Sequence, residues 1–297
     1  MNNILITGAT GFVGSHMSDY IIKNTNDKIY ATKRWMESID NIKHLINNPR
    51  FEFIDCQSFP EVSFKIPVIT LQTNVVGTTN LFESIKNSNY NPKIVSVSSS
   101  EVYGNPTKDE IPIKETNPIR AANPYSISKV GQDLMSQYYH KAYGMKIIIT
   151  RMFSHEGARR GKEFALSSFA NQIVQNEKGL GDYAIRHGNL DSVRTYNHID
   201  DAIEAYQMCS DSDKFGEVYN IGGDFTCSVG DALDKLISKS TISDKLTKVL
   251  DPARVRPTDI TLQIPSSEKF RKTTGWMPKK NLEHICEDLL NYWREVL

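Results

Sequence analysis

The fold is decided by the stretch ILITGATGFVG, residues 4–14. A short apolar run ends in a turn with three glycines, and apolar residues then recur at helical spacing up to Ile21. This order predicts a strand, a glycine turn and a helix. Such glycines let the backbone approach a diphosphate closely, and the amino end of the helix presents N–H groups to it. The candidate cofactor contacts in this stretch are Gly8, Thr10, Gly11, Phe12, Val13 and Gly14.

Strands and helices alternate from this stretch to about residue 150, which is typical of an α/β fold with a doubly wound parallel sheet of the Rossmann type. Beyond Arg151, shorter elements separated by glycines predict a smaller, substrate-binding lobe. The predicted domains are 1–153 and 154–297, with some elements of the second returning to the main sheet. The predicted strands are 28–32, 51–54, 93–97 and 146–150, and the predicted helices are 71–85, 124–143 and 282–296.

The segment between the third predicted strand and the next helix is too short for this fold. A crossover helix and a fourth strand together need roughly fifteen residues or more. Only residues 56–66 are available, and Pro60 argues against a central strand there. We therefore expect that roughly twenty residues are missing from the sequence near Cys56 and Gln57. The alternative is a true deletion.

The composition narrows the class of protein. Of the 297 residues, 39% are hydrophobic and 24% charged, which is typical of a soluble globular protein. Lysine plus arginine equals aspartate plus glutamate, 35 against 35, so nucleic acid is a poor default partner. The apolar runs are too short to span a membrane, and no secretion signal is visible. Four widely spaced cysteines indicate free thiols rather than disulfides or a metal site, so we expect a cytoplasmic protein.

The end of the second strand bears on the choice of cofactor. An acidic residue there usually binds the ribose hydroxyls of NAD. This strand instead ends in Lys33 and Arg34, and two cations favour the 2′-phosphate of NADP. NAD, with a solvated basic turn, is the alternative.

A second group of candidate residues indicates hydride-transfer chemistry. Tyr125 and Lys129 are four residues apart on a predicted helix and share one face, so the ammonium favours the phenolate. The strand 93–97 delivers Ser99, Ser100 and Glu101 to its carboxyl end, where ligands bind in such sheets. Plain turn chemistry would also account for the serines.

Several motifs together give a resemblance to a known family. They are GATGFVG from Gly8, SSSEVYG from Ser98, PYSISK from Pro124, RMFSHEGARRG from Arg151, GNLDSVRTYNHIDD from Gly188 and RPTD from Arg256. With these motifs the chain resembles the extended short-chain dehydrogenase/reductases that act on nucleotide sugars, most of all the GDP-mannose 4,6-dehydratases and their GDP-heptose relatives. The resemblance implies a GDP-sugar substrate and a homodimer or homotetramer.

The resemblance also implies roles for individual residues. Arg160 would contact the cofactor, while Ser154, Glu156, Arg159, Arg194 and Arg256 would bind the substrate. Arginine suits the phosphates because its planar fork matches their oxygens. The family usually has asparagine where this chain has Ser154.

The resemblance implies an internal hydride transfer. Tyr125, as phenolate, would take the proton of the sugar 4-hydroxyl while C4 passes a hydride to NADP, with Ser99 bound to the C4 oxygen and Lys129 holding the nicotinamide ribose. Glu101 would then remove the C5 proton and expel the C6 hydroxyl as water, assisted by Ser100. The alternatives are a GDP-4-keto-6-deoxy-sugar reductase, a 4-epimerase and a non-catalytic NADP-binding protein. The HEGARRG loop favours the dehydratase.

Overall fold

The computed structural model describes residues 1–33, 38–55, 67–255 and 260–297. The chain divides into two compact units, residues 1–60 and 61–297. The predicted boundary at residue 153 stays a prediction. The expected gap near Cys56 and Gln57 falls outside the described residues.

The first unit is a parallel sheet with one long helix. Its strands are β1 (Asn3–Ile6), β2 (Lys28–Lys33) and β3 (Phe51–Asp55), in the order β1-β2-β3. Ile29 is paired with Ile4 on one side and with Phe51 on the other, both in parallel register. Among the described residues of this unit, helix α1 (Phe12–Asn24) and a short helical turn (Asp40–Leu45) accompany the sheet, and the core includes the fully buried Ile21. The predicted strand, turn and helix order is confirmed.

The second unit contains a parallel sheet of three described strands in the order β4-β5-β9. These are β4 (Lys93–Val97), β5 (Lys146–Met152) and β9 (Val218–Ile221). Ile147, Ile148 and Ile149 of β5 are buried, and the helices over Pro124–Tyr143 and Ile199–Asp211 both contact this strand. The chain therefore returns to this sheet long after residue 154.

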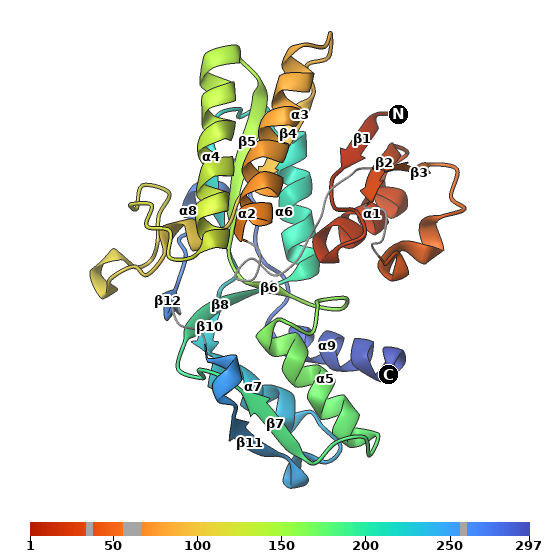
Figure 1. Ribbon diagram of the computed structural model, residues 1–297, viewed down its shortest axis with the longest axis vertical. Coiled ribbons are helices and arrows are strands. Elements are labelled where there is room, and N and C mark those ends of the chain that lie inside the picture. The colour runs from red at the N-terminus through yellow and green to blue at the C-terminus, as the bar shows by residue number, and fades with distance from the viewer. Residues whose placement is uncertain (34–37, 56–66, 256–259) are drawn as a thin grey trace. The chain divides into compact units, whose positions relative to one another are not determined.

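Helices pack beside this sheet (Figure 1). They are α2 (Pro67–Leu71), α3 (Gly77–Lys86), α4 (Pro124–Tyr143), α6 (Ile199–Asp211) and α8 (Glu268–Thr274). The predicted helix 71–85 is interrupted by a π-helical turn, Gln72–Val76, that lies against α4. Gly131 permits this approach, because a Cβ there would lie 2.7 Å from Cγ2 of Val75. The fold class predicted from the sequence is confirmed.

The rest of the second unit, where it is described, consists of small sheets and α-helices. Its helices are α5 (Ala165–Glu177), α7 (Val229–Ser238) and α9 (Leu282–Val296), which share one apolar core. Strand β8 (Val193–His198) lies between β10 (Phe225–Ser228) and β12 (Leu262–Gln263) and also pairs with β6 (His155–Glu156). Strand β7 (Ala184–His187) pairs with β11 (Thr247–Leu250). Within the described ranges, no helix is both long enough and apolar enough to cross a bilayer.

Candidate active site

The glycine turn of the first unit is closed by its own backbone. The Gly11 N–H donates to the Gly8 carbonyl at 3.0 Å, and Gly8 has a left-handed φ of 68°. A Cβ on Gly14 would lie 2.3 Å from the Gly8 oxygen, so no side chain fits there. Helix α1 begins at Phe12 without a side-chain cap, and the buried Thr10 hydroxyl has no partner among the described residues. These features fit a diphosphate, which would accept hydrogen bonds from the helix end and the hydroxyl.

The second strand bears on the predicted cofactor phosphate. Thr32 accepts a hydrogen bond from the Gly8 N–H at 3.2 Å, which ties β2 to the glycine turn. Lys33 follows, with its ammonium 5.3 Å from the centroid of the Phe53 ring. Its predicted partner Arg34 lies outside the described residues.

The start of helix α4 is held by a reciprocal cap. Oδ1 of Asn123 accepts from the Ser126 N–H at 2.8 Å, and Oγ of Ser126 accepts from the Asn123 N–H at 2.9 Å. Pro124 occupies the first turn, where its missing N–H costs nothing. These contacts place Tyr125 in the first turn of the helix and Lys129 one turn later.

The serines after β4 lead into a short 3-10 helical turn, Ser100–Tyr103. The Ser98 N–H donates to the Thr150 carbonyl at 2.8 Å, and the Ser99 hydroxyl accepts from the Glu101 N–H at 3.2 Å. Ser98, Ser99 and Ser100 are buried. Ser100 donates to Oε1 of Gln263 at 3.3 Å, so its hydroxyl is already engaged.

Tyr125, Ser99 and Glu101 come together at this strand end. Burial and the charge of Glu101 raise the pKa of Tyr125 to about 12, while a hydrogen bond from Ser99 and the charge of Arg160 act in the opposite direction. The phenol therefore stays protonated at neutral pH in the protein alone. It needs additional positive charge nearby before it acts as a base.

Lys129 is poised close to this group. Its ammonium lies 5.9 Å from the centroid of the Tyr125 ring and donates to the Val97 carbonyl at 2.9 Å and to Gln132 at 2.8 Å. Burial lowers the pKa of Lys129 to about 8. These two hydrogen bonds hold the ammonium at the end of β4, beside the ring of Tyr125.

The loop that starts at β6 brings further charged groups to the second unit's site. Glu156 is buried, and burial raises its pKa although Arg160 opposes the shift. The two side chains approach to 3.7 Å between Nε and Oε2. Burial also lowers the pKa of His155 to about 4, so this imidazole is neutral. Arg160 thus lies within electrostatic reach of both Glu156 and Tyr125.

The same loop is anchored from the C-terminal helix. Asp288 of α9 accepts a hydrogen bond from the Ala158 N–H at 2.8 Å. Gly157, which precedes Ala158, has a φ of 158°, and a Cβ there would lie 2.5 Å from Cγ2 of Ile199. Arg159 follows in the left-handed region, at a φ of 67°. The loop conformation is therefore set by packing.

The other predicted substrate residues are less closely grouped. The Ser154 carbonyl accepts from the Asn197 N–H at 2.9 Å, which joins β6 to β8. Arg194 on β8 donates to the Val193 carbonyl at 3.0 Å. Arg256 lies outside the described residues.

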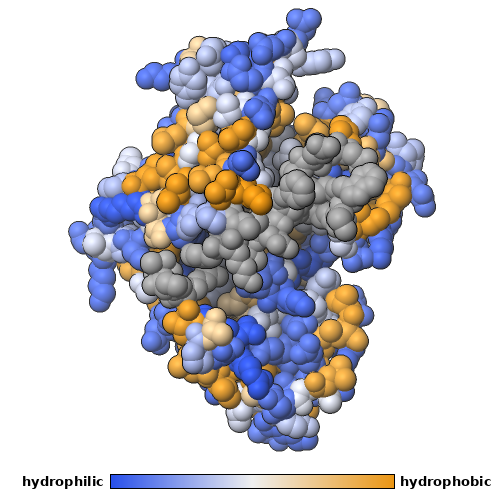
Figure 2. Space-filling model, in the orientation of Figure 1, coloured by the Kyte–Doolittle hydropathy of each residue, from blue (hydrophilic) through white to orange (hydrophobic). Residues whose placement is uncertain are grey.

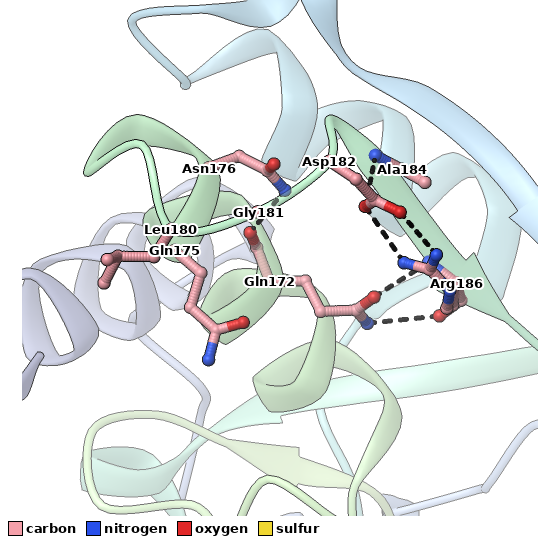
Figure 3. Close-up of a pocket in the computed structure, with 8 residues that line it drawn as sticks. All are labelled: Gln172, Gln175, Asn176, Leu180, Gly181, Asp182, Ala184 and Arg186. Carbon is pink, nitrogen blue, oxygen red and sulfur yellow. Dashed lines mark hydrogen bonds and ion pairs between the residues drawn. The ribbon is translucent and has the colours of Figure 1, made fainter.

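One surface pocket, of about 360 Å³, lies elsewhere on the second unit (Figure 3). Its lining residues from α5 and β7 include none that the sequence singled out. Gln172 bonds both backbone groups of Arg186, and Arg186 in turn is paired with Asp182. Because these polar groups bind one another, the pocket is held together by its own contacts.

Three residues near the site escaped the sequence reasoning. Asn123 donates from Nδ2 to Oε2 of Glu101 at 2.9 Å, and its place before Pro124 is a recognisable cap signal. Gln132 lies one helical turn beyond Lys129. Gln263, the partner of Ser100, is 163 residues away in the chain, so no local pattern points to it.

Comparisons with known proteins agree with the resemblance. The family model described as GDP-mannose 4,6 dehydratase matches residues 53–289. The GDP-6-deoxy-D-mannose reductase of Pseudomonas aeruginosa is 25% identical over 98% of this chain and 96% of its own length. The GDP-mannose 4,6-dehydratase of Yersinia enterocolitica is also 25% identical, over 98% of this chain and 93% of its own length.

The fold is also shared with solved structures. The structure titled RMD from Pseudomonas aeruginosa complexed with NADPH has a TM-score of 0.82 at 23% identity, and all of both chains is covered. At that identity the match shows the fold. The family model, which spans most of the chain, shows that this protein belongs to the GDP-mannose 4,6-dehydratase family.

Proposed function

We propose that this protein is an NADP-dependent 4,6-dehydratase that converts a GDP-hexose or GDP-heptose to the 4-keto-6-deoxy sugar. The observation that carries the proposal is the carboxylate of Glu101, held beside Tyr125 and Ser99 at the end of β4. Hydride transfer alone needs only the tyrosine and its helpers. A carboxylate within reach of the same sugar supplies the base that an elimination requires.

The chain's own groups would divide the work as follows. Tyr125 takes the proton of the 4-hydroxyl, and Ser99 hydrogen-bonds the oxygen that becomes the ketone. Lys129 keeps its ammonium 5.9 Å from the centroid of the Tyr125 ring, and an oxidised nicotinamide would add the further positive charge that the buried phenol needs in order to ionise. Glu101 then removes the C5 proton, which the ketone has made acidic, and delivers it to the departing C6 hydroxyl. A nicotinamide cofactor would supply the acceptor for the C4 hydride and return that hydride at C6. C5 then takes up a proton from solvent, which completes the 4-keto-6-deoxy sugar, and Tyr125 releases to solvent the proton that it took.

The rest of the site would bind the nucleotide sugar and the cofactor. Arg159, Arg194 and Arg256 offer guanidinium groups to the diphosphate. Glu156 and Ser154 would contact the sugar. Lys33 and Arg34 would bind the 2′-phosphate of NADP, and Arg160 would complete the cofactor side near Tyr125.

A GDP-4-keto-6-deoxy-sugar reductase is the second candidate. The Pseudomonas aeruginosa reductase covers nearly the full length of this chain, which favours it specifically. A reductase needs Tyr125, Lys129 and Ser99 but has nothing for Glu101 to eliminate.

One experiment separates these functions. The purified protein is incubated with GDP-mannose or a GDP-heptose and a substoichiometric amount of NADP. The molecular masses of the products are then measured by mass spectrometry. The dehydratase yields a product lighter by one water with no net change in cofactor. A reductase leaves these sugars unchanged but oxidises one NADPH for each molecule of GDP-4-keto-6-deoxymannose, and that result would replace the proposal.

We also propose that copies of the chain pair through α4 and the helical segment before α3. Val68, Val76, Ile127, Leu134 and Tyr138 on these elements are half or more exposed. Figure 2 shows apolar side chains gathered on the face that α2 and α4 present to the viewer. Pairing would remove this apolar surface from water. Sedimentation equilibrium should give a dimer or tetramer of the 33.6 kDa chain.

A further inference from the structure

We infer that Asn123 is a positioning residue for Glu101: one side-chain amide both starts the catalytic helix and orients the base of the elimination step. The inference deepens the proposed function and rests on it. Oδ1 of Asn123 caps α4 through the Ser126 N–H at 2.8 Å, and Nδ2 donates to Oε2 of Glu101 at 2.9 Å.

The orientation of the Asn123 amide follows from the chain. A backbone N–H only donates, so the atom that faces Ser126 must be the oxygen, Oδ1. The amide nitrogen is thereby turned towards the carboxylate, which only accepts when ionised. The cap and the bond to Glu101 are therefore satisfied by the same rotamer.

Hydrogen bonds hold both the backbone and the carboxylate of Glu101. Its backbone N–H donates to Ser99 at 3.2 Å, and its carboxylate accepts from Asn123. Ser99 also hydrogen-bonds Tyr125, which lies two residues after Asn123. Glu101 and Tyr125 are thus connected in two ways. Ser99 hydrogen-bonds both of them, and Asn123, which bonds Glu101, caps the helix that carries Tyr125.

The amide leaves one oxygen of Glu101 for the sugar. Asn123 occupies Oε2 with a hydrogen bond to an ionised group, the stronger kind. This bond fixes the direction of the other oxygen, which is left to accept the C5 proton. Loss of such a bond slows the step that uses it by about ten- to a hundredfold.

The cap and the contact to Glu101 are separable by substitution. Serine is as good a helix cap as asparagine but carries no amide donor. Asn123→Ser should therefore leave the folding of α4 intact and remove only the bond to Glu101. Asn123→Asp also keeps the cap but puts a second negative charge beside Glu101. Asn281, which caps α9 through the His284 N–H, offers the matched control Asn281→Ser.

The test is a single-turnover experiment with GDP-mannose and NADP. Absorbance of the reduced nicotinamide reports oxidation at C4, and deuterium taken up at C5 from heavy water reports the proton step. In Asn123→Ser we expect C4 oxidation at nearly the wild-type rate, with C5 exchange slowed about ten- to a hundredfold, so that reduced cofactor accumulates. Asn123→Asp should show the same split. Asn281→Ser should change neither step.

Three outcomes would overturn the inference. The first is wild-type C5 exchange in Asn123→Ser. The second is an equal fall of both steps together with a lower melting temperature, because a purely structural cap would act that way. The third is a wild-type protein that dehydrates no GDP-sugar, which removes the proposed function and the inference with it. A wild-type protein that dehydrates normally, beside an unaffected Asn123→Ser, leaves the proposed function standing.

Discussion

The buried ion pair between Asp133 and Arg151 gives a sharp prediction about stability. The Asp133 side chain is fully buried and that of Arg151 is 4% exposed. The two form a bidentate pair, with 2.9 Å from Nε to Oδ2 and 3.1 Å from Nη2 to Oδ1. Arg151 also donates to the hydroxyl of Tyr103 at 2.8 Å. The pair therefore links the helix that carries Tyr125 to the turn that carries Glu101.

Removing one partner leaves a buried charge without its counter-charge. The variant Asp133→Ala should lose about 3–5 kcal/mol of the free energy of unfolding, because Tyr103 and the Glu115 carbonyl offer Arg151 only neutral partners. The double variant Asp133→Leu with Arg151→Met should recover most of that loss, since two apolar side chains need no partner.

Urea unfolding followed by tryptophan fluorescence measures both variants. An exposed pair supplies the control: Lys272→Met breaks the bond to Glu268, whose side chain is 61% exposed, and the surface location predicts almost no change. A loss below about 1 kcal/mol in Asp133→Ala would refute the reasoning, because that is what an exposed pair contributes. So would a double variant as unstable as the single one.

Four further predictions concern the site and the chain. Glu101→Gln should slow dehydration by roughly two to four orders of magnitude while reduction of the cofactor by C4 persists; unchanged product formation by mass spectrometry would exclude Glu101 as the base. Burial lowers the pKa of Lys129 to about 8, so kcat/KM should fall as the pH rises through 8 and the ammonium loses its proton. A kcat/KM that stays constant to pH values well above 8 would contradict this prediction. Gly14→Ala should weaken NADPH binding about tenfold or more in a fluorescence titration, because its Cβ would meet the Gly8 oxygen, whereas Gly77→Ala, with 3.7 Å to the nearest atom, should bind normally. The intact mass of the protein made from the native gene should exceed 33.6 kDa by the mass of roughly twenty residues. A mass equal to that of the 297-residue chain would favour the true deletion.

Much of the fold could be predicted because its signals are local. The glycine turn, the helix after it and the cap before Pro124 are each encoded within a few neighbouring residues. Helix α9 lies over Leu282–Val296, as its periodicity predicted. The π-helical turn Gln72–Val76 could not be predicted, because it depends on the close approach that Gly131 permits from another helix.

The candidate site divides in the same way. The strand-end rule placed Ser99 and Glu101 where ligands bind, and the structure brings both to Tyr125. The roles of these residues stay a prediction. The rule gave no hint of Asp288, which lies 130 residues beyond the loop that it anchors through Ala158.

The sequence by itself determined which residues form the strand, the glycine turn and the helix that carries Tyr125, because caps, glycines and apolar spacing act over one or two turns of chain. Only the tertiary structure decided that Asn123 faces Glu101 and that Ser100 faces Gln263. A hydrogen bond needs its two atoms within about 3 Å, and segments far apart in the chain reach that distance only once the whole core has packed.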